Sequence, residues 1–245
     1  MKYNKSEFDS KIFGKNWYRL DISDEKECNA EKILDAIRNS DAEYIDIKIT
    51  GEQLKFERKL KEIGFRKVCM QISMCCELIK QNIEPSSVTT FSDKPLDENI
   101  IKKLSENNSK SFTTSRFYLD EKLNLENVFE FQRQWIRNSL EDYNMLKFIY
   151  RDSFLTVKQI GKNIKTDLIA VPIQDRNKGI GGKLFTDAIG YSKGIGCEEM
   201  WATISTENLP TYRMHTKVGF EVRSFISCLN LDVEDLINQR NRNEK

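Results

Sequence analysis

Hydrophobic and polar residues alternate along the C-terminal half in a way that predicts strands and helices in turn. The run DLIAV at 167–171 is typical of a buried strand, and Pro172 ends its hydrogen-bond ladder. Apolar residues then recur at helical spacing from Ile180 until Gly194 and Gly196. Further on, the pattern predicts a strand, a helix that starts near Asn208 and ends at Gly219, and another strand, over 201–205, 211–218 and 220–231. This order predicts an α/β fold with a mixed sheet.

The N-terminal half repeats part of this pattern. The spacing predicts a strand, a helix and a second strand over 44–49, 54–63 and 66–78. The segment LKEIGFRKV resembles HTKVGFEVR near the C-terminus, since both read as helix, Gly-Phe, strand. Residues 1–80 are therefore interpreted as a degenerate second copy of half the fold, although this unit also recurs by chance in α/β proteins.

The middle of the chain is predicted to hold a linker and two helices. Pro and Ser residues at 81–95 indicate a linker or exposed loop, and 98–108 reads as a helix. A second helix is predicted over 127–140, where four apolar residues share one face: Phe131, Trp135, Ile136 and Leu140.

Three glycines and three cations stand in RNKGIGGKLF, residues 176–185. The loop lacks the Ser or Thr of a Walker A motif after Lys183, and Leu184 replaces the third glycine of a dinucleotide fingerprint. The remaining pattern, Arg176-x-x-Gly179-x-Gly181, opens a helix whose first amides can converge on a phosphate. The alternative is a glycine-rich turn with solvated cations.

Followed by the distal Asn208 and a helix that runs into Gly-Phe, this loop resembles the signature of the GNAT superfamily of acetyltransferases over residues 140–231. The resemblance implies that the loop binds the pyrophosphate of acetyl-CoA and that the preceding strand parts from its neighbour to receive the pantetheine arm. Asn208 then contacts the cofactor, or it is a plain helix N-cap. The cofactor-binding residues implied in this way are Ile169, Ala170, Val171, Arg176, Asn177, Lys178, Gly179, Ile180, Gly181, Gly182, Lys183, Asn208 and Thr211.

Composition narrows the class of protein. The 39 basic and 38 acidic residues nearly cancel, so charge predicts no nucleic-acid partner. The chain carries no apolar run long enough to span a membrane and no signal-peptide core, which favours a cytoplasmic protein. Six cysteines without Cys-x-x-Cys spacing, beside a single histidine, predict reduced and mostly buried thiols rather than a metal site.

A looser resemblance covers nearly the whole chain. FDSKIFGKNWYRL at 8–20 and SRFYLDEKL at 115–123, ahead of a Trp-bearing helix, resemble the dTDP-fucosamine acetyltransferase branch of the superfamily. This resemblance implies acetyl transfer to the primary amine of a nucleotide-linked amino sugar, and the family makes a homodimer plausible. It also implies a degenerate GNAT-like domain at 1–85, which contributes to the acceptor site, and a catalytic domain at 86–245.

Three residues are candidate acceptor ligands. Arg116 can grip a diphosphate bidentately, or it can form a structural ion pair with Asp120. Tyr118 and Trp135 can stack on a base or sugar ring, although aromatic residues at helical spacing are usually core.

The catalytic candidates are an acid and a base. The family often places a tyrosine acid seven residues after the signature Asn, where this chain has His215; a structural role for this histidine is the alternative, and Tyr212 is a second candidate acid. Asp167 is the candidate base that the resemblance implies, because it lies on the cofactor strand four residues before Val171, where the family often has a Glu that works through water; a period of two puts it on one face with Ile169 and Val171. Its alternative is a solvated residue at the start of the strand, and this reading is favoured.

The sequence thus predicts an acetyl-CoA-dependent N-acetyltransferase that acts on a nucleotide-linked deoxyamino sugar by direct attack on the thioester. Two alternatives stand beside it. One keeps the enzyme and changes the acceptor to another small amine, an antibiotic or a protein N-terminus. The other is a non-catalytic CoA-binding sensor or scaffold, suggested by His215 and the degenerate first half.

Overall fold

The chain forms two compact units that are interleaved along the sequence. The computed structural model describes residues 1–22, 29–51, 55–83 and 87–243. Unit 1 comprises residues 1–71, 116–128 and 224–245, and unit 2 comprises 72–115 and 129–223. This division differs from the predicted one at residue 85, because two later segments pack with the N-terminal residues. The mixed α/β architecture predicted from the sequence is confirmed.

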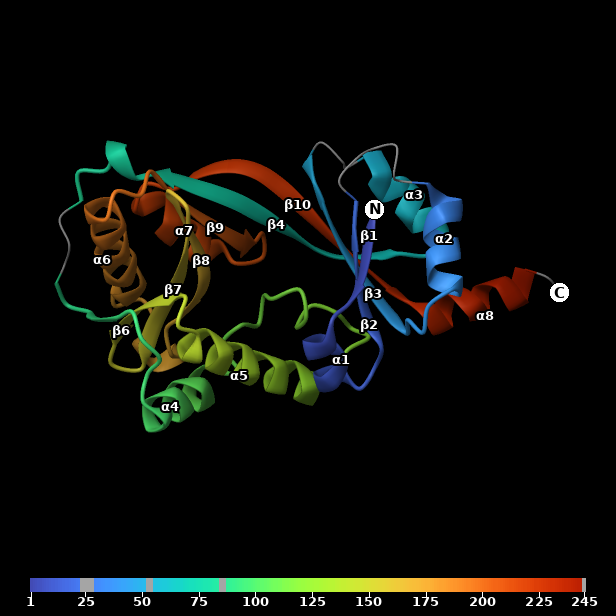
Figure 1. Ribbon diagram of the computed structural model, residues 1–245, viewed down its shortest axis with the longest axis horizontal. Helices are drawn as coiled ribbons and strands as arrows, with labels where there is room; N and C mark the ends of the chain where they lie inside the picture. Colours follow the sequence, from blue (N-terminus) through green and yellow to red (C-terminus); the bar gives the residue numbers. More distant parts are fainter. Residues whose placement is uncertain (23–28, 52–54, 84–86, 244–245) are drawn as a thin grey trace. The chain divides into compact units, whose positions relative to one another are not determined.

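Unit 1 is built on the strand order β1-β2-β3-β10-β4 (Figure 1). β2 and β3 are parallel, whereas β1 with β2 and β3 with β10 are antiparallel. The last two strands, β10 and β4, have residues in both units. The element bounds are β1 (Lys2–Lys5), α1 (Glu7–Phe13), β2 (Trp17–Asp21), α2 (Ala30–Arg38), β3 (Tyr44–Thr50), α3 (Lys55–Ile63), β4 (Arg66–Glu77), β10 (Glu221–Asp232) and α8 (Val233–Asn243).

One face of the unit 1 sheet is aliphatic, and the other, called the polar face below, carries Asp46 together with the buried aromatic residues Trp17 and Tyr44. Ile45, Ile47 and Ile49 are buried against α2 and α3 through residues such as Ile33 and Leu60. The helices themselves follow from amphipathic spacing, and α2 begins where the Asn29 side chain accepts hydrogen bonds from two backbone amides.

The polar face of β3 carries Asp46, which is buried in an ionic contact. Its carboxylate accepts hydrogen bonds from Arg116 Nη1 at 2.7 Å and from Trp17 Nε1 at 2.9 Å. Arg116 is only 8% exposed, and its guanidinium also stacks on the Phe117 ring. A buried guanidinium that is paired in this way is satisfied inside unit 1.

Asp120 has other partners than the one suggested by the sequence. Its carboxylate binds the Tyr44 hydroxyl, the Arg66 guanidinium and the Asn230 amide. The predicted alternative of an Arg116–Asp120 ion pair is therefore wrong in its partner, since Arg116 pairs with Asp46. The strand register places Asp46 directly opposite Asn230 on the same face of the sheet. Asp46 binds Arg116, whereas Asp120 binds Arg66 and Asn230.

Unit 2 has the strand order β4-β9-β8-β7-β6-β5. β5 to β8 form an antiparallel meander, and β8 pairs with β9 in parallel. β6 and β7 were not predicted, and β5 lies inside the predicted linker, whereas α4 has the predicted bounds. The elements are β5 (Thr90–Ser92), α4 (Glu98–Asn108), α5 (Leu125–Glu141), β6 (Met145–Tyr150), β7 (Ser153–Ile160), β8 (Asn163–Ala170), α6 (Ile180–Gly194), β9 (Glu199–Ser205) and α7 (Leu209–Lys217).

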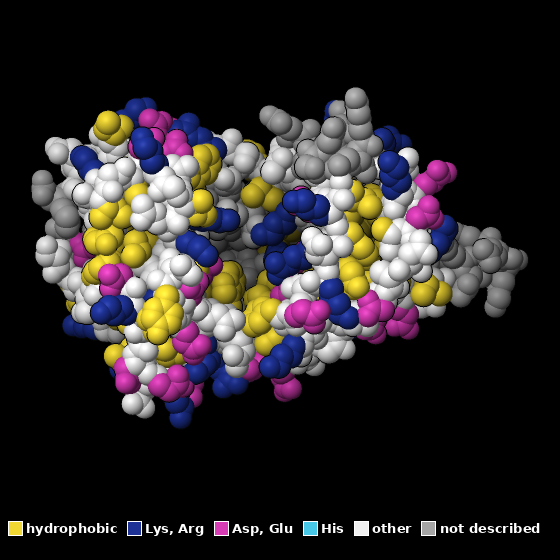
Figure 2. Space-filling view, viewed as in Figure 1, with side chains coloured by type: hydrophobic (Ala, Val, Ile, Leu, Met, Phe, Trp, Pro, Cys, Tyr) yellow, Lys and Arg dark blue, Asp and Glu magenta, His cyan; other side chains and the backbone are white. Residues whose placement is uncertain are grey.

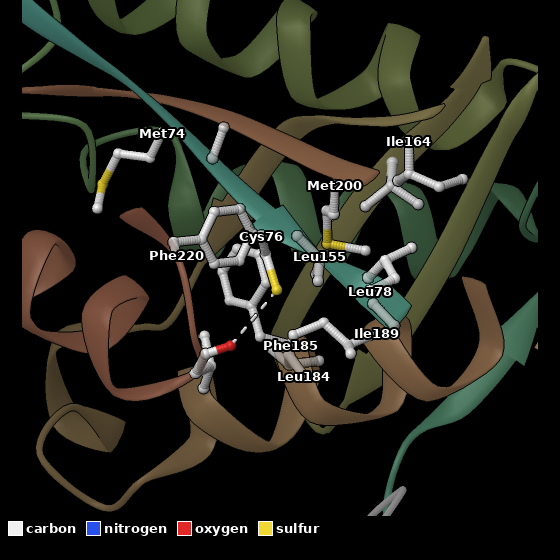
Figure 3. Packing of buried hydrophobic residues seen from close by; sticks show 14 of the residues in the cluster. Met74, Cys76, Leu78, Leu155, Ile164, Leu184, Phe185, Ile189, Met200 and Phe220 are labelled. Atoms are coloured by element: carbon white, nitrogen blue, oxygen red, sulfur yellow. Dashed lines mark hydrogen bonds between the residues drawn. The ribbon is translucent and has the colours of Figure 1, made fainter. Parts of the chain in front are cut away.

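Each face of the unit 2 sheet is covered by its own helices. On one face, Leu184, Phe185 and Ile189 of α6 pack against Leu155 and Met200 (Figure 3). On the other face, Ile101 and Leu104 of α4 and Ile136 and Leu140 of α5 pack against Phe154 and Leu168. Sheet residues in the first core lie on the face that α6 covers, called the α6 face, and those in the second core lie on the opposite face, called the α5 face.

His215 belongs to the core on the α6 face. It is 1% exposed and lies edge-on against Phe185 and Phe220, with ring centroids 4.6 and 4.9 Å away. Its Nδ1 is 2.8 Å from the Thr211 carbonyl oxygen, to which it donates, and Nε2 is buried without a hydrogen-bond partner in the described part of the chain. Burial lowers the pKa of His215 to about 4, so the ring is neutral at pH 7. No histidine is visible on the face drawn in Figure 2.

This burial makes His215 a source of acid sensitivity. The unfolded residue has a pKa of about 6.5. Below that pH the His215 imidazole is protonated in the unfolded chain but stays neutral in the folded chain until the pH nears 4. Its contribution to stability is present above about pH 6.5 and is lost as pH falls toward 4. We expect the free energy of unfolding in urea to fall by about 2 kcal/mol from this residue between pH 7 and pH 5.

His215→Asn is the matched variant for this measurement, because its amide nitrogen can still donate to the Thr211 carbonyl while its side chain does not titrate. We expect the variant to lose less stability than the wild type over the same pH range. His215 is the single histidine of the sequence, so no other imidazole contributes. Equal losses in the two proteins would contradict the assignment.

Arg116 provides a second stability test. Replacing it with Met leaves the Asp46 carboxylate buried without its cation, and we expect a loss of about 3–5 kcal/mol in the free energy of unfolding. The double variant with Asp46→Asn as well should be less destabilised than the single variant. Arg58→Met is the control, since that side chain is 90% exposed. An unchanged unfolding free energy for Arg116→Met would contradict a structural ion pair.

Candidate active site

The parallel strands β8 and β9 diverge within unit 2. Their parallel ladder covers three residue pairs and ends at Lys165 with Trp201, although β8 continues to Ala170 and β9 to Ser205. Backbone groups of β8 beyond the ladder that point toward β9 are therefore available to a ligand lying between the two strands. Pro172 follows directly and has no N–H to pair.

A β-bulge lies in β8 where this divergence begins. Thr156 of β7 is paired with Leu168 and Val157 with Thr166, so Asp167 is an extra residue in the ladder. Its effect on the faces of the strand is clear from the packing. Ile164 and Ile169 both contact the α6 core, although they are an odd number of residues apart. A bulge re-aims side chains in this way.

The bulge turns Asp167 toward α5. Ser139 and Trp135 of that helix lie near its half-buried carboxyl group and lower its pKa. The prediction that Asp167 shares a face with Ile169 is thus wrong, because the strict period of two does not hold through a bulge. The competing interpretation, a solvated residue at the start of a strand, is wrong as well, since Asp167 lies in the middle of β8.

Burial raises the pKa of Asp167, and the nearby Ser139 and Trp135 side chains of α5 oppose this rise. The Ser139 hydroxyl donates to Thr156 Oγ1 at 2.7 Å, and the Leu168 amide donates to the same oxygen at 3.2 Å. These two bonds tie α5 and β7 to the backbone of β8 beside the bulge.

The glycine loop follows β8 and leads into α6. Asn177 and Gly179 have φ values of 62° and 76°, in the left-handed region that favours glycine at the second position. Gly179 is the N-cap of α6, and the first turn of this helix carries Lys183 and no acidic residue. Free amides at a helix N-terminus beside cations suit an anion.

The three glycines have different physical roles. Gly179 adopts a left-handed conformation, and Gly182 faces open space. At Gly181 an added Cβ would lie 2.4 Å from Met214 Sδ, so the absence of a side chain lets α6 pack closely on α7. Close packing at Gly181 is thus a role beside the predicted convergence of the loop amides on an anion, which stays a prediction.

The loop cations also differ. Arg176 Nε donates to the Val171 carbonyl at 3.1 Å and an Nη atom donates to that of Ser111 at 3.3 Å, which holds the loop against the end of β8. Lys178 pairs with Asp175 at 2.8 Å. Both side chains are exposed, as is Lys183.

Helix α7 carries the predicted acid residues. Asn208 is its N-cap and accepts from the Thr211 amide at 3.2 Å, so the N-cap interpretation is confirmed. Tyr212 is partly buried and packs against the α6 core together with Ile169 and Val171. The end of β8 and the candidate acid therefore contact the same core, while Asp167 lies on the other face.

The structure gathers most of the predicted site in unit 2. The cofactor residues, Asp167, Tyr212 and His215 lie there, whereas Arg116 and Tyr118 belong to unit 1. Trp135 packs against Phe112 and Phe131 and lies near Asp167, which fits the alternative that this aromatic residue belongs to the core. Ser139 and Thr156 were missed, because single hydroxyl residues in a helix and a strand carry no sequence signal.

None of the helices in the described residues combines the length and the hydrophobicity that a bilayer span requires. Within the same residues, no group of three or more His, Cys, Asp or Glu side chains is placed to hold a metal ion.

Comparison with known proteins gives a consistent result. Residues 167–220 match the model of the Acetyltransferase (GNAT) family. The chain is similar to a GCN5-related N-acetyltransferase from Sphaerobacter thermophilus, with a TM-score of 0.56, 16% identity, and coverage of 83% of this chain and 65% of that one. Among curated protein sequences, none matches.

Two further solved structures share the fold. A tandem GNAT protein from the clavulanic acid biosynthesis pathway has a TM-score of 0.58 at 11% identity, with coverage of 89% and 76% of the two chains. A GCN5-related glucosamine N-acetyltransferase region of a fungal multi-domain β-N-acetylglucosaminidase has the same score and identity, with coverage of 94% and 31%. At such identities the likeness shows the fold. The family match over residues 167–220 and this shared fold together support an acetyltransferase of the GNAT type.

Proposed function

We propose that the chain is an acetyl-CoA-dependent N-acetyltransferase acting on the primary amine of a nucleotide-linked deoxyamino sugar, with dTDP as the proposed nucleotide. The observation that carries acetyl transfer is the parting of β8 from β9 directly before the glycine loop, with the Asp167 carboxyl group at the bulge. The acceptor class rests on the sequence resemblance alone.

The residues around the parted strands fit coenzyme A. Amides at the start of α6, next to Lys183, suit the pyrophosphate, because a helix N-terminus favours negative charge. Backbone groups of 169–171 beyond the ladder can pair with the amides of the pantetheine arm. When bound, acetyl-CoA supplies the thioester that the amine attacks. Asn208 and Thr211, at the start of α7, are the proposed further contacts.

Asp167 is the proposed general base. An amine must lose a proton to attack, and a base works best when its pKa lies near the working pH. Burial raises the pKa of Asp167 toward that range, and the nearby Ser139 and Trp135 side chains limit this rise. The amine therefore approaches from the α5 face in this mechanism.

Tyr212 is the proposed acid that protonates the departing thiolate. It lies on the α6 face with the end of β8, and a phenol has a proton to give at neutral pH. His215, the other candidate, has its only proton engaged by the Thr211 carbonyl, and its ring is enclosed by aromatic residues. Packing is thus the better-supported role for His215. Backbone amides near Ile169 and Val171 are the proposed oxyanion donors.

A nucleotide diphosphate on the acceptor would need a partner other than Arg116. Arg116, the residue expected to bind a diphosphate, is buried and paired with Asp46. This observation favours an acceptor recognised through other groups, so another small primary amine is the second candidate. The fungal neighbour is described as a glucosamine N-acetyltransferase region, which keeps amino sugars within the range of acceptors.

The acceptor is testable by thiol release from acetyl-CoA with dTDP-, UDP- and GDP-linked amino sugars and with free amino sugars and small amines. We expect turnover with a nucleotide-linked amino sugar to exceed that with the matching free sugar. Turnover with free amines alone would reject the nucleotide-linked acceptor and keep the acetyltransferase. CoA binding without turnover on any acceptor would instead favour the sensor alternative.

The base is testable by Asp167→Asn. We expect kcat to fall by about 10²- to 10⁴-fold, with the Kd for CoA unchanged. In the wild type, kcat/KM should rise with pH through the raised pKa of Asp167, and this rise should flatten in the variant. Ser139→Ala removes a nearby hydroxyl group that lowers the pKa of Asp167, so the rise should move to higher pH. Asp97→Asn, which preserves the N-cap of α4, is the control. A fully active Asp167→Asn enzyme would remove Asp167 from the mechanism.

A further inference from the structure

A groove lies at the edge of the unit 2 sheet, between α4 and the strands β5 and β6. Its volume is about 350 Å³, which is within the range of small-molecule sites. β5 is the last strand in the sheet order, and β6 and β7 separate it from β8. The groove is therefore distinct from the opening between β8 and β9.

The inner wall of the groove is apolar. Leu104 of α4 is 1% exposed and packs with Ile149 in the core on the α5 face, whereas Ile100, one turn earlier on α4, is 45% exposed. The strand register puts Thr90 of β5 opposite Ile149, so both side chains lie on this face of the sheet. A ligand that covered Ile100 would remove apolar surface from water, which favours a ligand with an apolar body.

The rim of the groove carries an ion pair and a cation that has no carboxylate partner among the described residues. Lys103 Nζ is 2.7 Å from the Asp152 carboxylate, which also accepts from Asn107 Nδ2 at 3.2 Å. Arg151 lies in the turn between β6 and β7, and its guanidinium is 5.2 Å from the centre of the Tyr150 ring. Because the Lys103 and Asp152 charges cancel, Arg151 leaves the rim with a net positive charge. Its fork of N–H donors matches a carboxylate.

We propose that this groove binds a small amphipathic carboxylate. The apolar part of the ligand lies against Ile100 and Leu104, and its carboxylate pairs with Arg151. A single negative charge suits the rim, because Asp152 would repel a ligand that carried several. The proposal does not depend on acetyl transfer, since no residue that lines the groove belongs to the candidate active site.

Methyl NMR of the full chain, with labelled isoleucine and leucine and with octanoate as the probe, tests this proposal. Octylamine reverses the charge on the same hydrocarbon chain at pH 7, and acetate keeps the charge without that chain. We expect octanoate to shift the Ile100, Leu104 and Ile149 signals to saturation, and the other two probes to bind about tenfold more weakly or less. No saturable shift, equal affinity for octylamine, or octanoate shifts confined to Ile169 and Ile180 would overturn the proposal.

Arg151→Asn tests the carboxylate contact. Asparagine removes the guanidinium and tolerates the left-handed backbone of this position, where φ is 55°. We expect the Kd for octanoate to rise by about tenfold or more. Lys102→Gln is the control and should leave the Kd unchanged, because this exposed cation of α4 does not line the groove. An unchanged Kd in Arg151→Asn would overturn the proposal, and the comparison of octanoate with octylamine needs no variant to fold.

Discussion

The separation of β8 from β9 is the constraint on which the candidate site depends. Paired strands satisfy their backbone groups, and a parallel ladder that ends after three residue pairs leaves part of both strands without that pairing. Two features limit the number of unpaired backbone groups. Pro172 removes one donor at the end of β8, and the bulge at Asp167 changes the direction of the strand where the ladder stops. A ligand with amide groups can satisfy the remaining positions.

Unit 1 is organised by a different constraint, the pairing of buried charges. Its sheet has one apolar face and one polar face, and the polar face is covered by the segment that contains Arg116 and Asp120. Buried ion pairs contribute little net stability compared with hydrophobic residues, but each carboxylate accepts only a matching donor in a matching position. The Arg116–Asp46 and Arg66–Asp120 pairs therefore specify how this segment docks on the sheet, although it is distant in sequence from β3 and β10.

The sequence predicted the elements that carry strong periodicity or clear boundary residues. α4, α6 and α7 lie where apolar spacing, glycines and Asn208 placed them, and the loop between β8 and α6 was identified from its glycines. Other features depend on tertiary contacts. The bulge could not be predicted, because Ile164, Leu168 and Ala170 keep one parity although they face different cores. The partner of Arg116 is set by strand register, and the burial of His215 by aromatic residues from two other elements.

The bulge also bears on the type of reaction. Asp167 faces α5, whereas Tyr212 packs on the α6 side with the end of β8. In direct acetyl transfer the amine loses a proton and the departing thiolate gains one, so a base near the amine and an acid near the thiol suit the reaction. An opening between parted strands, with a carboxyl group toward one face and a phenol toward the other, provides both groups in the proposed mechanism. The bonds of Ser139 and Leu168 to Thr156 fix the backbone beside the bulge, and the bulge keeps Asp167 on the α5 side.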